Sequence, residues 1–250
     1  MWTVASTSPA GLSGTFTDAT DPTTTFTGAE PGVYIFQWEV ATGECSGSDL
    51  VRIDNYDNPT PSAAGADFDN CGFTAQLAGN TPTVGLGEWT VISTPVGAPT
   101  PNILNPILPN TLVTNLVTGD YTFRWTITSG LVCIPSEDDV VVTVIENPTQ
   151  PIADDINICP DPVPTTAALQ GNAIALGTGT WSVASQPMGS GTVGFDDVND
   201  PTTNATNLEY GTYELVWSAE NLGCILTDTA TILVSEPPTP ADVSGSAIEF

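Results

Sequence analysis

Apolar and polar residues alternate in three segments of the chain that share one pattern. These segments begin at Tyr34, Tyr121 and Tyr213, and every second residue after each tyrosine is apolar over the next six positions. A period of two predicts a β-strand with one buried face. Similar short apolar runs surround Trp2, Trp89 and Trp181, which precede these segments. No part of the chain has an apolar period of 3.6 residues over three turns. The pattern therefore predicts an all-β chain.

The three segments belong to a longer internal repeat. Each tyrosine follows a glycine by two positions, precedes a tryptophan by four, and lies 32 positions after another tryptophan. A cysteine follows the second tryptophan by seven or eight positions. The matching residues are Trp2, Tyr34, Trp38 and Cys45, then Trp89, Tyr121, Trp125 and Cys133, then Trp181, Tyr213, Trp217 and Cys224. A period of about 90 residues fits one small sandwich. We therefore expect tandem Ig-like β-sandwich domains in an elongated array.

Proline-rich segments mark the ends of the repeats, at residues 58–61, 147–151 and 237–240. Proline fixes φ and lacks a donor, so these segments are expected to be short, stiff linkers. They divide the chain into 1–58, 59–147, 148–237 and 238–250. The first part lacks the first two strands of the repeat, and the last holds a linker and the first strand of a following repeat. We expect a window onto a longer chain rather than a pilin that exchanges strands.

The six tryptophans and three tyrosines are expected to be structural. The tryptophans fit either a sugar-stacking platform or a sandwich core, and their alternation with other apolar residues favours the core. Sugar stacking is a better role for the loop residues Tyr56 and Tyr210. The Gly-x-Tyr sequence resembles the tyrosine corner of Ig-like sandwiches. It predicts that the hydroxyls of Tyr121 and Tyr213 bond to the backbone near the preceding turn.

Composition removes several classes of chemistry. The chain has no histidine, no lysine, two basic residues and a net charge of −27. A Ser-His-Asp triad, a His-ligated zinc and a lysine Schiff base are therefore excluded, and we do not expect an enzyme or a cofactor. The charge disfavours nucleic acid and anionic lipid as partners. No stretch is apolar enough to span a membrane as a helix.

Acidic residues recur in corresponding loops of the first and third repeats. They are Asp18, Asp21, Asp196, Asp197 and Asp200. Carboxylate oxygens at alternating loop positions suit Ca²⁺. Aspartate also starts turns through its own side-chain hydrogen bonds, and this interpretation is favoured here. A further aspartate precedes each repeat's last strand, at Asp49, Asp139 and Asp228.

Five cysteines in a histidine-free chain indicate disulfides rather than metal ligands or nucleophiles. We favour pairs within repeats, Cys71–Cys133 and Cys159–Cys224, with a partner for Cys45 outside this sequence. Pairing across the linkers, as Cys45–Cys71 and Cys133–Cys159, is one alternative. A Cys71–Cys224 bond is another. Simple Ig topology counts against the pairs within repeats, because it puts their two turns at opposite ends of a sandwich.

The chain resembles a known group along its whole length, most clearly in the second repeat. Its Ala-Gly-x-Asp sequence, with Leu77–Asn80, Gly87–Val91, Thr122–Ile127 and Asp139–Val141, is similar to the tandem PKD-like/Ig-like repeats of large Bacteroidota surface proteins, including SprB-type gliding adhesins. The resemblance implies a surface filament or stalk exported by type IX secretion, and it supplies no catalytic residue. It also makes Thr229, within Asp-Thr-Ala, a candidate for O-glycosylation rather than part of an aspartic protease motif.

The function expected from these observations is structural. We expect an acidic extracellular stalk on the bacterial cell surface, whose partners are neighbouring repeats of the same chain. A glycan- or surface-binding array, with surface polysaccharide as partner, is the alternative. An accessory segment of a secreted enzyme is the third interpretation. Neither nucleic acid nor direct membrane insertion is expected.

Overall fold

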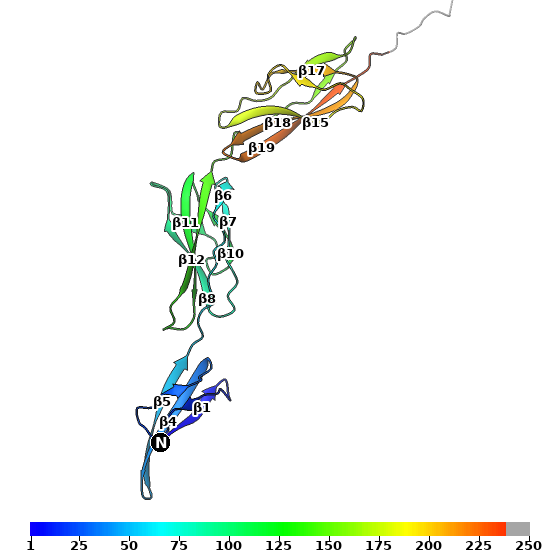
Figure 1. Cartoon of the computed structure of the whole chain (residues 1–250). Coiled ribbons are helices and arrows are strands. Elements are labelled where there is room, and N and C mark those ends of the chain that lie inside the picture. The colour runs from blue at the N-terminus through cyan, green and yellow to red at the C-terminus, as the bar shows by residue number, and fades with distance from the viewer. Residues whose placement is uncertain (239–250) are drawn as a thin grey trace, which may run out of the picture. The chain divides into compact units, whose positions relative to one another are not determined.

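The computed structural model describes residues 1–238, and it consists of β-strands joined by turns (Figure 1). Within these residues the sheets form three two-layered sandwiches. The predicted all-β, Ig-like fold is thus confirmed. The strand predicted at Ala241–Phe250 lies outside the described residues. No helix among the described residues is long and apolar enough to cross a membrane.

The chain divides into two compact units. One contains Met1–Phe68, Thr74–Leu116 and Asp120–Val142, and the other contains Asp69–Phe73, Val117–Gly119 and Thr143–Phe250. The division passes through the second sandwich. Its segment Asp69–Phe73 falls in the same unit as the third sandwich, to which Cys71 is bonded through Cys224.

The second sandwich has seven strands. One sheet has the order β6-β12-β11-β8 and the other β7-β10-β9. Their bounds are β6 Phe68–Cys71, β7 Ala75–Ala78, β8 Leu86–Ser93, β9 Asn102–Ile103, β10 Asn110–Thr114, β11 Gly119–Thr128 and β12 Ser136–Ile145. Strand β11 is the predicted alternating segment, and it pairs antiparallel with β8 so that Trp125 lies opposite Trp89. Both indoles are buried, with ring centroids 5.1 Å apart.

The third sandwich repeats this plan. Its sheets have the orders β13-β19-β18-β15 and β14-β17-β16. The strands are β13 Ile156–Ile158, β14 Thr165–Ala168, β15 Thr178–Ser185, β16 Gly194–Phe195, β17 Asn204–Leu208, β18 Gly211–Asn221 and β19 Cys224–Val234. Trp181 lies opposite Trp217 in the β15–β18 ladder, and both are buried. The first strand, β13, runs parallel to β19, with Ile158 opposite Val234.

The first sandwich has fewer strands. Its sheets have the orders β1-β4-β5 and β2-β3. The strands are β1 Trp2–Ser8, β2 Thr15–Phe16, β3 Phe26–Thr27, β4 Gly32–Thr42 and β5 Cys45–Asn55. They correspond in order to the last five strands of the other two sandwiches. Within the described residues, nothing corresponds to β6 and β7, so β5 is an edge strand.

The tyrosine of each repeat is buried at the start of its long strand. Tyr34 donates its hydroxyl to the carbonyls of Ser13 and Glu30, at 3.0 Å in both cases. Tyr213 donates to the carbonyl of Glu209 at 3.2 Å and accepts the Glu209 N–H at 2.8 Å. Tyr121 is 0% exposed. In the first and third repeats the phenol thereby ties the turn before the strand to the core, as a tyrosine corner does.

Truncating a core indole should destabilise one sandwich strongly. Trp217 is 1% exposed and packs against Trp181, so Trp217→Ala is expected to cost about 3–5 kcal/mol. Calorimetry of the whole chain should show one melting transition at lower temperature. The matched variant Trp38→Ala removes a half-buried indole of the first sandwich and should cost less. Equal losses would contradict this assignment of cores.

Candidate functional site: the open face of the first sandwich

The inner face of β5 is exposed, whereas the same face is buried in the other sandwiches. Val51 and Ile53 lie opposite Phe36 and Tyr34 and are 40% and 47% exposed. In the third sandwich the equivalent positions are Ala230 and Ile232, which are 1% and 0% exposed; those of the second, Val140 and Val142, are 1% and 0% exposed. We call this surface, formed by Trp2, Trp38, Val51 and Ile53, the open face.

Segments 59–80 and 148–172 cover the equivalent face in the complete sandwiches, and we call each the covering segment of its sandwich. Each contributes two short strands, one beside the last strand of the repeat and one in the opposite sheet. Leu77 and Leu169 point into the cores and are 0% and 1% exposed. Gly79 follows Leu77 by two positions and lies so close to the Trp125 ring that a Cβ there would be 3.1 Å from it. The covering segment therefore needs a leucine and then a glycine at this spacing.

A set of polar contacts that recurs within the chain fixes the covering segment. Asp138 Oδ2 accepts the Ala64 N–H at 2.7 Å, and Asp228 Oδ2 accepts the Ala153 N–H at 2.9 Å. Asp228 lies opposite Trp217 in the sheet, just as Asp49 lies opposite Trp38. In the first sandwich Asp49 accepts only its neighbour's N–H among the hydrogen bonds of the described residues, from Leu50. Asp49 is thus at the position that holds the covering segment elsewhere.

The covering segment also supplies acceptors. Asp67 accepts the Val141 N–H at 2.8 Å, and Asp155 accepts the Thr231 N–H at 2.7 Å. The corresponding residue of β5 is Arg52, three positions after Asp49. The carbonyls of Asn80 and Asn172 accept the indole N–H groups of Trp125 and Trp217, at 3.1 and 3.2 Å. The corresponding indole of the first sandwich is Trp38.

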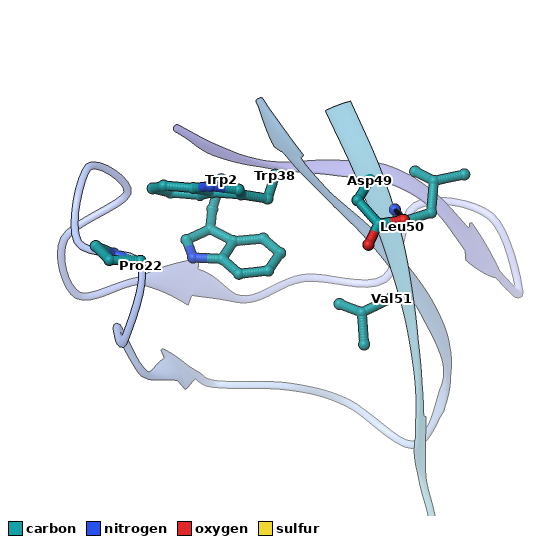
Figure 2. Close-up of a pocket in the computed structure, with 6 residues that line it drawn as sticks. All are labelled: Trp2, Pro22, Trp38, Asp49, Leu50 and Val51. Carbon is teal, nitrogen blue, oxygen red and sulfur yellow. Dashed lines mark hydrogen bonds between the residues drawn. The ribbon is translucent and has the colours of Figure 1, made fainter. Parts of the chain in front are cut away.

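A pocket of about 190 Å³ opens on this face, lined by Trp2, Pro22, Trp38, Asp49, Leu50 and Val51. Figure 2 shows the two indoles together between Pro22 on one side and Val51 of β5 on the other. The indole centroids are 5.1 Å apart. The pocket is an apolar hollow with one carboxylate at its rim, and it can take an apolar side chain next to a main-chain N–H.

The few basic groups are held by carboxylates on outer strand surfaces. Arg52 donates to Asp54 Oδ1 from Nε and Nη2, at 2.9 and 2.8 Å. Arg124 bonds Asp139 through Nε at 2.7 Å and Glu137 through Nη1 at 2.6 Å. The Arg124 guanidinium lowers the pKa of the Asp139 carboxyl. In the second sandwich Asp139 therefore pairs with arginine, whereas its neighbour Asp138 holds the covering segment.

The favoured disulfide pairs within repeats are wrong. The bond formed is Cys71–Cys224, and Cys45, Cys133 and Cys159 are free thiols. Cys159 Sγ lies 3.6 Å from the Glu236 carbonyl, beyond the far end of β19 from Cys224. Strand β19 runs from Cys224 to Val234, so at about 3.3 Å per residue it separates the two thiols by roughly 30 Å. Topology thus rules out the Cys159–Cys224 pair, and the Cys71–Cys133 pair for the same reason.

The predicted calcium loops form turns in which threonine donates to aspartate. Asp18 Oδ1 accepts the Thr20 N–H and hydroxyl at 2.8 and 2.7 Å. The same two bonds join Asp21 to Thr23 and Asp200 to Thr202. In the third sandwich Asp197 accepts the Asn199 N–H, and Asp196 accepts from Asn204 Nδ2. Within residues 1–238, no three acidic side chains gather in a geometry that holds a metal.

These turns change the acidity of two carboxyls. The Thr20 hydroxyl, and then its main-chain N–H, lower the pKa of Asp18 below its usual 3.8. The Thr202 main-chain N–H, and then its hydroxyl, lower the pKa of Asp200 in the same direction. Hydrogen bonds to the ionised form cause both changes, since they stabilise the charged state.

The other predicted residues lie away from the open face. Thr229 is exposed in β19, where its N–H bonds Asp228 Oδ1 at 3.0 Å. Tyr210 packs against the third core, and its hydroxyl donates to the Pro160 carbonyl at 3.4 Å. The ring of Tyr56 lies against Gly130, where a Cβ would be 2.3 Å away. Tyr56 nevertheless remains 39% exposed. Trp2 and Trp38, which the sequence pattern alone places in a core, are half-buried and line the pocket.

Comparison with known proteins finds similar folds but no family. No protein-family model matches the sequence, and no curated protein matches it. Among solved structures, extracellular domains 3–5 of Drosophila OTK are similar over 82% of this chain and 70% of theirs, with 10% identity and a TM-score of 0.42. Titin I67–I69 is 12% identical over 83% of this chain and 75% of its own, with a TM-score of 0.32. Sidekick-1 immunoglobulin domains 1–5 are 14% identical over 82% of this chain and 47% of their own, with a TM-score of 0.32.

The Thr20 hydroxyl should set the acidity of Asp18. A carboxyl whose pKa is lowered by folding adds stability above its unfolded pKa, and that stability is lost as the pH falls through the folded pKa. Thr20→Val should therefore raise the pKa of Asp18 towards 3.8, measured by carboxyl ¹³C NMR titration, and leave that of Asp200 unchanged. An Asp18 pKa that stays the same in the variant would contradict a role for the Thr20 hydroxyl.

Calcium should have little effect on melting. A site saturated at 100 times its Kd would stabilise a domain by about 2.7 kcal/mol, which shifts Tm by several degrees. Because the loop carboxylates already accept hydrogen bonds from threonines, we expect a chelator to leave the melting of the chain almost unchanged. A fall of more than about five degrees with chelator would make calcium structural.

Proposed function

We propose that this chain is a structural repeat segment of a bacterial extracellular surface adhesin or filament of the SprB type, acting as an acidic, non-enzymatic stalk. One observation carries the proposal: one sandwich plan recurs three times among the described residues, with fewer strands in the first, and each copy has the tryptophan pair and the buried tyrosine. Proline-rich segments join the copies. Such arrays serve as spacers because each domain folds on its own core. The bacterial assignment rests on the resemblance of the chain, clearest in its second repeat, to surface-protein repeats.

The Cys71–Cys224 disulfide supports a mechanical role. It joins β6 of the second sandwich to β19 of the third, two residues that are 153 positions apart in sequence. Disulfides persist in oxidising compartments, so the bond supports an extracellular setting. Tension applied at the ends of the chain passes through this bond, which keeps the residues between the two cysteines from extending.

The charge supports exposure to solvent along the whole segment. A net charge of −27 with only two basic residues keeps neighbouring copies apart by repulsion. Both arginines are bonded to carboxylates on outer strand surfaces. A stalk that must stay soluble and separate from its neighbours has this charge.

A surface-binding array is the second candidate, and the open face favours it. Trp2 and Trp38 are half-buried beside Pro22 in an apolar pocket. Exposed indoles stack on sugar rings, and polysaccharide is the ligand to test. Binding of the chain to a glycan array, lost in Trp38→Ala and kept in Trp217→Ala, would establish this function in place of the stalk.

Pulling single molecules tests the mechanical role. With the disulfide intact, the residues between the two cysteines cannot extend. Reduction should therefore add about 500 Å of extensible length, since 153 residues span roughly 3.4 Å each. The variant Cys71→Ser should behave as the reduced chain without any reductant. If reduction adds no length, the disulfide does not carry load and the mechanical proposal is wrong.

A further inference from the structure

The contacts around Cys224 show how one repeat holds the covering segment of the repeat before it. Cys71 ends β6, and the next residue, Gly72, donates its N–H to the Ile145 carbonyl at 2.8 Å. Cys71 therefore lies beside the end of β12. Cys224 bonds it from the third sandwich, where Asn221 Nδ2 also donates to the Glu146 carbonyl at 2.8 Å.

Cys133 occupies the same position relative to the end of the first sandwich. Its Sγ lies 3.5 Å from the Asp57 carbonyl, and Ser129 Oγ donates to that carbonyl at 2.8 Å. Asp57 follows Asp49 by eight residues, as Glu146 follows Asp138. The contact between Ser129 and Asp57 is thus the counterpart of that between Asn221 and Glu146. A cysteine at the end of a strand beside β5 would meet Cys133.

We propose that the open face binds an extended two-strand segment with the residue pattern of 59–80, and that Cys133 forms a disulfide with the cysteine of this segment. Asp49 would accept a main-chain N–H of the segment, as Asp138 accepts that of Ala64. The leucine of the segment would fill the pocket beside Trp38 and Val51. The inference rests on the repeated contacts and goes beyond the stalk function, so either can fail without the other.

The bond forms by thiol–disulfide exchange. The Cys133 thiolate attacks the segment's cysteine sulfur in a mixed disulfide with a small aromatic thiol, the new S–S bond forms, and the small thiolate leaves. No other oxidant is needed. Because docking holds the two sulfurs together, the effective concentration of the segment at Cys133 far exceeds its concentration in solution.

The test uses the whole chain with its Cys71–Cys224 bond intact and a synthetic peptide of residues 59–80. The peptide's cysteine carries thionitrobenzoate, whose release is followed by absorbance, and mass spectrometry locates the adduct. Cys45 and Cys159 are exposed, whereas Cys133 is half-buried. We expect the peptide to attach to Cys133 in preference to each of the others by about tenfold or more. As a control, the mixed disulfide of free cysteine with thionitrobenzoate replaces the peptide. This small reagent should react first with the exposed thiols of Cys45 and Cys159.

Two variants separate docking from thiol reactivity. A peptide with Leu77→Asp should lose the preference for Cys133, because the leucine position is buried in the equivalent sandwich. A chain with Asp49→Ala should lose it too, whereas Asp228→Ala in the third sandwich, the matched control, should keep it. Equal labelling of the three thiols, or an undiminished preference in Asp49→Ala, would overturn the proposal.

Discussion

Each sandwich depends on covering the apolar inner face of its last two strands with the segment that begins the repeat. That segment is short and forms only two short strands, so strand pairing alone does not hold it on the sheet. Leu77 and Leu169 supply the apolar anchor, and the carboxylates of Asp138 and Asp228 hold the main chain against the sheet. In the first sandwich no described segment plays this role, and Val51 of its last strand is 40% exposed. The tryptophan pair is then half-open as well.

The sequence pattern predicts the strands and the aromatic core because both follow from local spacing. Alternation put Tyr213 and Trp217 on one face, and the structure buries both. The disulfide could not be predicted in this way. The favoured Cys159–Cys224 pair fails because β13 runs parallel to β19, which places these two cysteines at opposite ends of a long strand. Topology of this kind is invisible to spacing between cysteines, although the opposed turns of an Ig sandwich already counted against the pairs within repeats.

The polar contacts of the covering segment show a second limit of sequence reasoning. The aspartate in the last strand of a repeat is visible in the sequence, but its partner is a main-chain N–H about 75 residues away. In the second sandwich two adjacent aspartates share the roles, and only the structure shows that Asp139 pairs with Arg124 while Asp138 accepts from Ala64. The loop aspartates illustrate the reverse case, since the tendency of aspartate to start turns predicts the turns that form at Asp18, Asp21 and Asp200.

Amide hydrogen exchange in a chain that carries a covering segment for the first sandwich tests the central role of this segment most directly. Residues 59–88 would be joined directly before Trp2, which reproduces the spacing found before Trp89. We predict that the Arg52 amide, exposed on an edge strand in this chain, becomes as protected as the equivalent amides of Val141 and Thr231. An Arg52 amide that exchanges equally fast with and without the added segment would contradict this role.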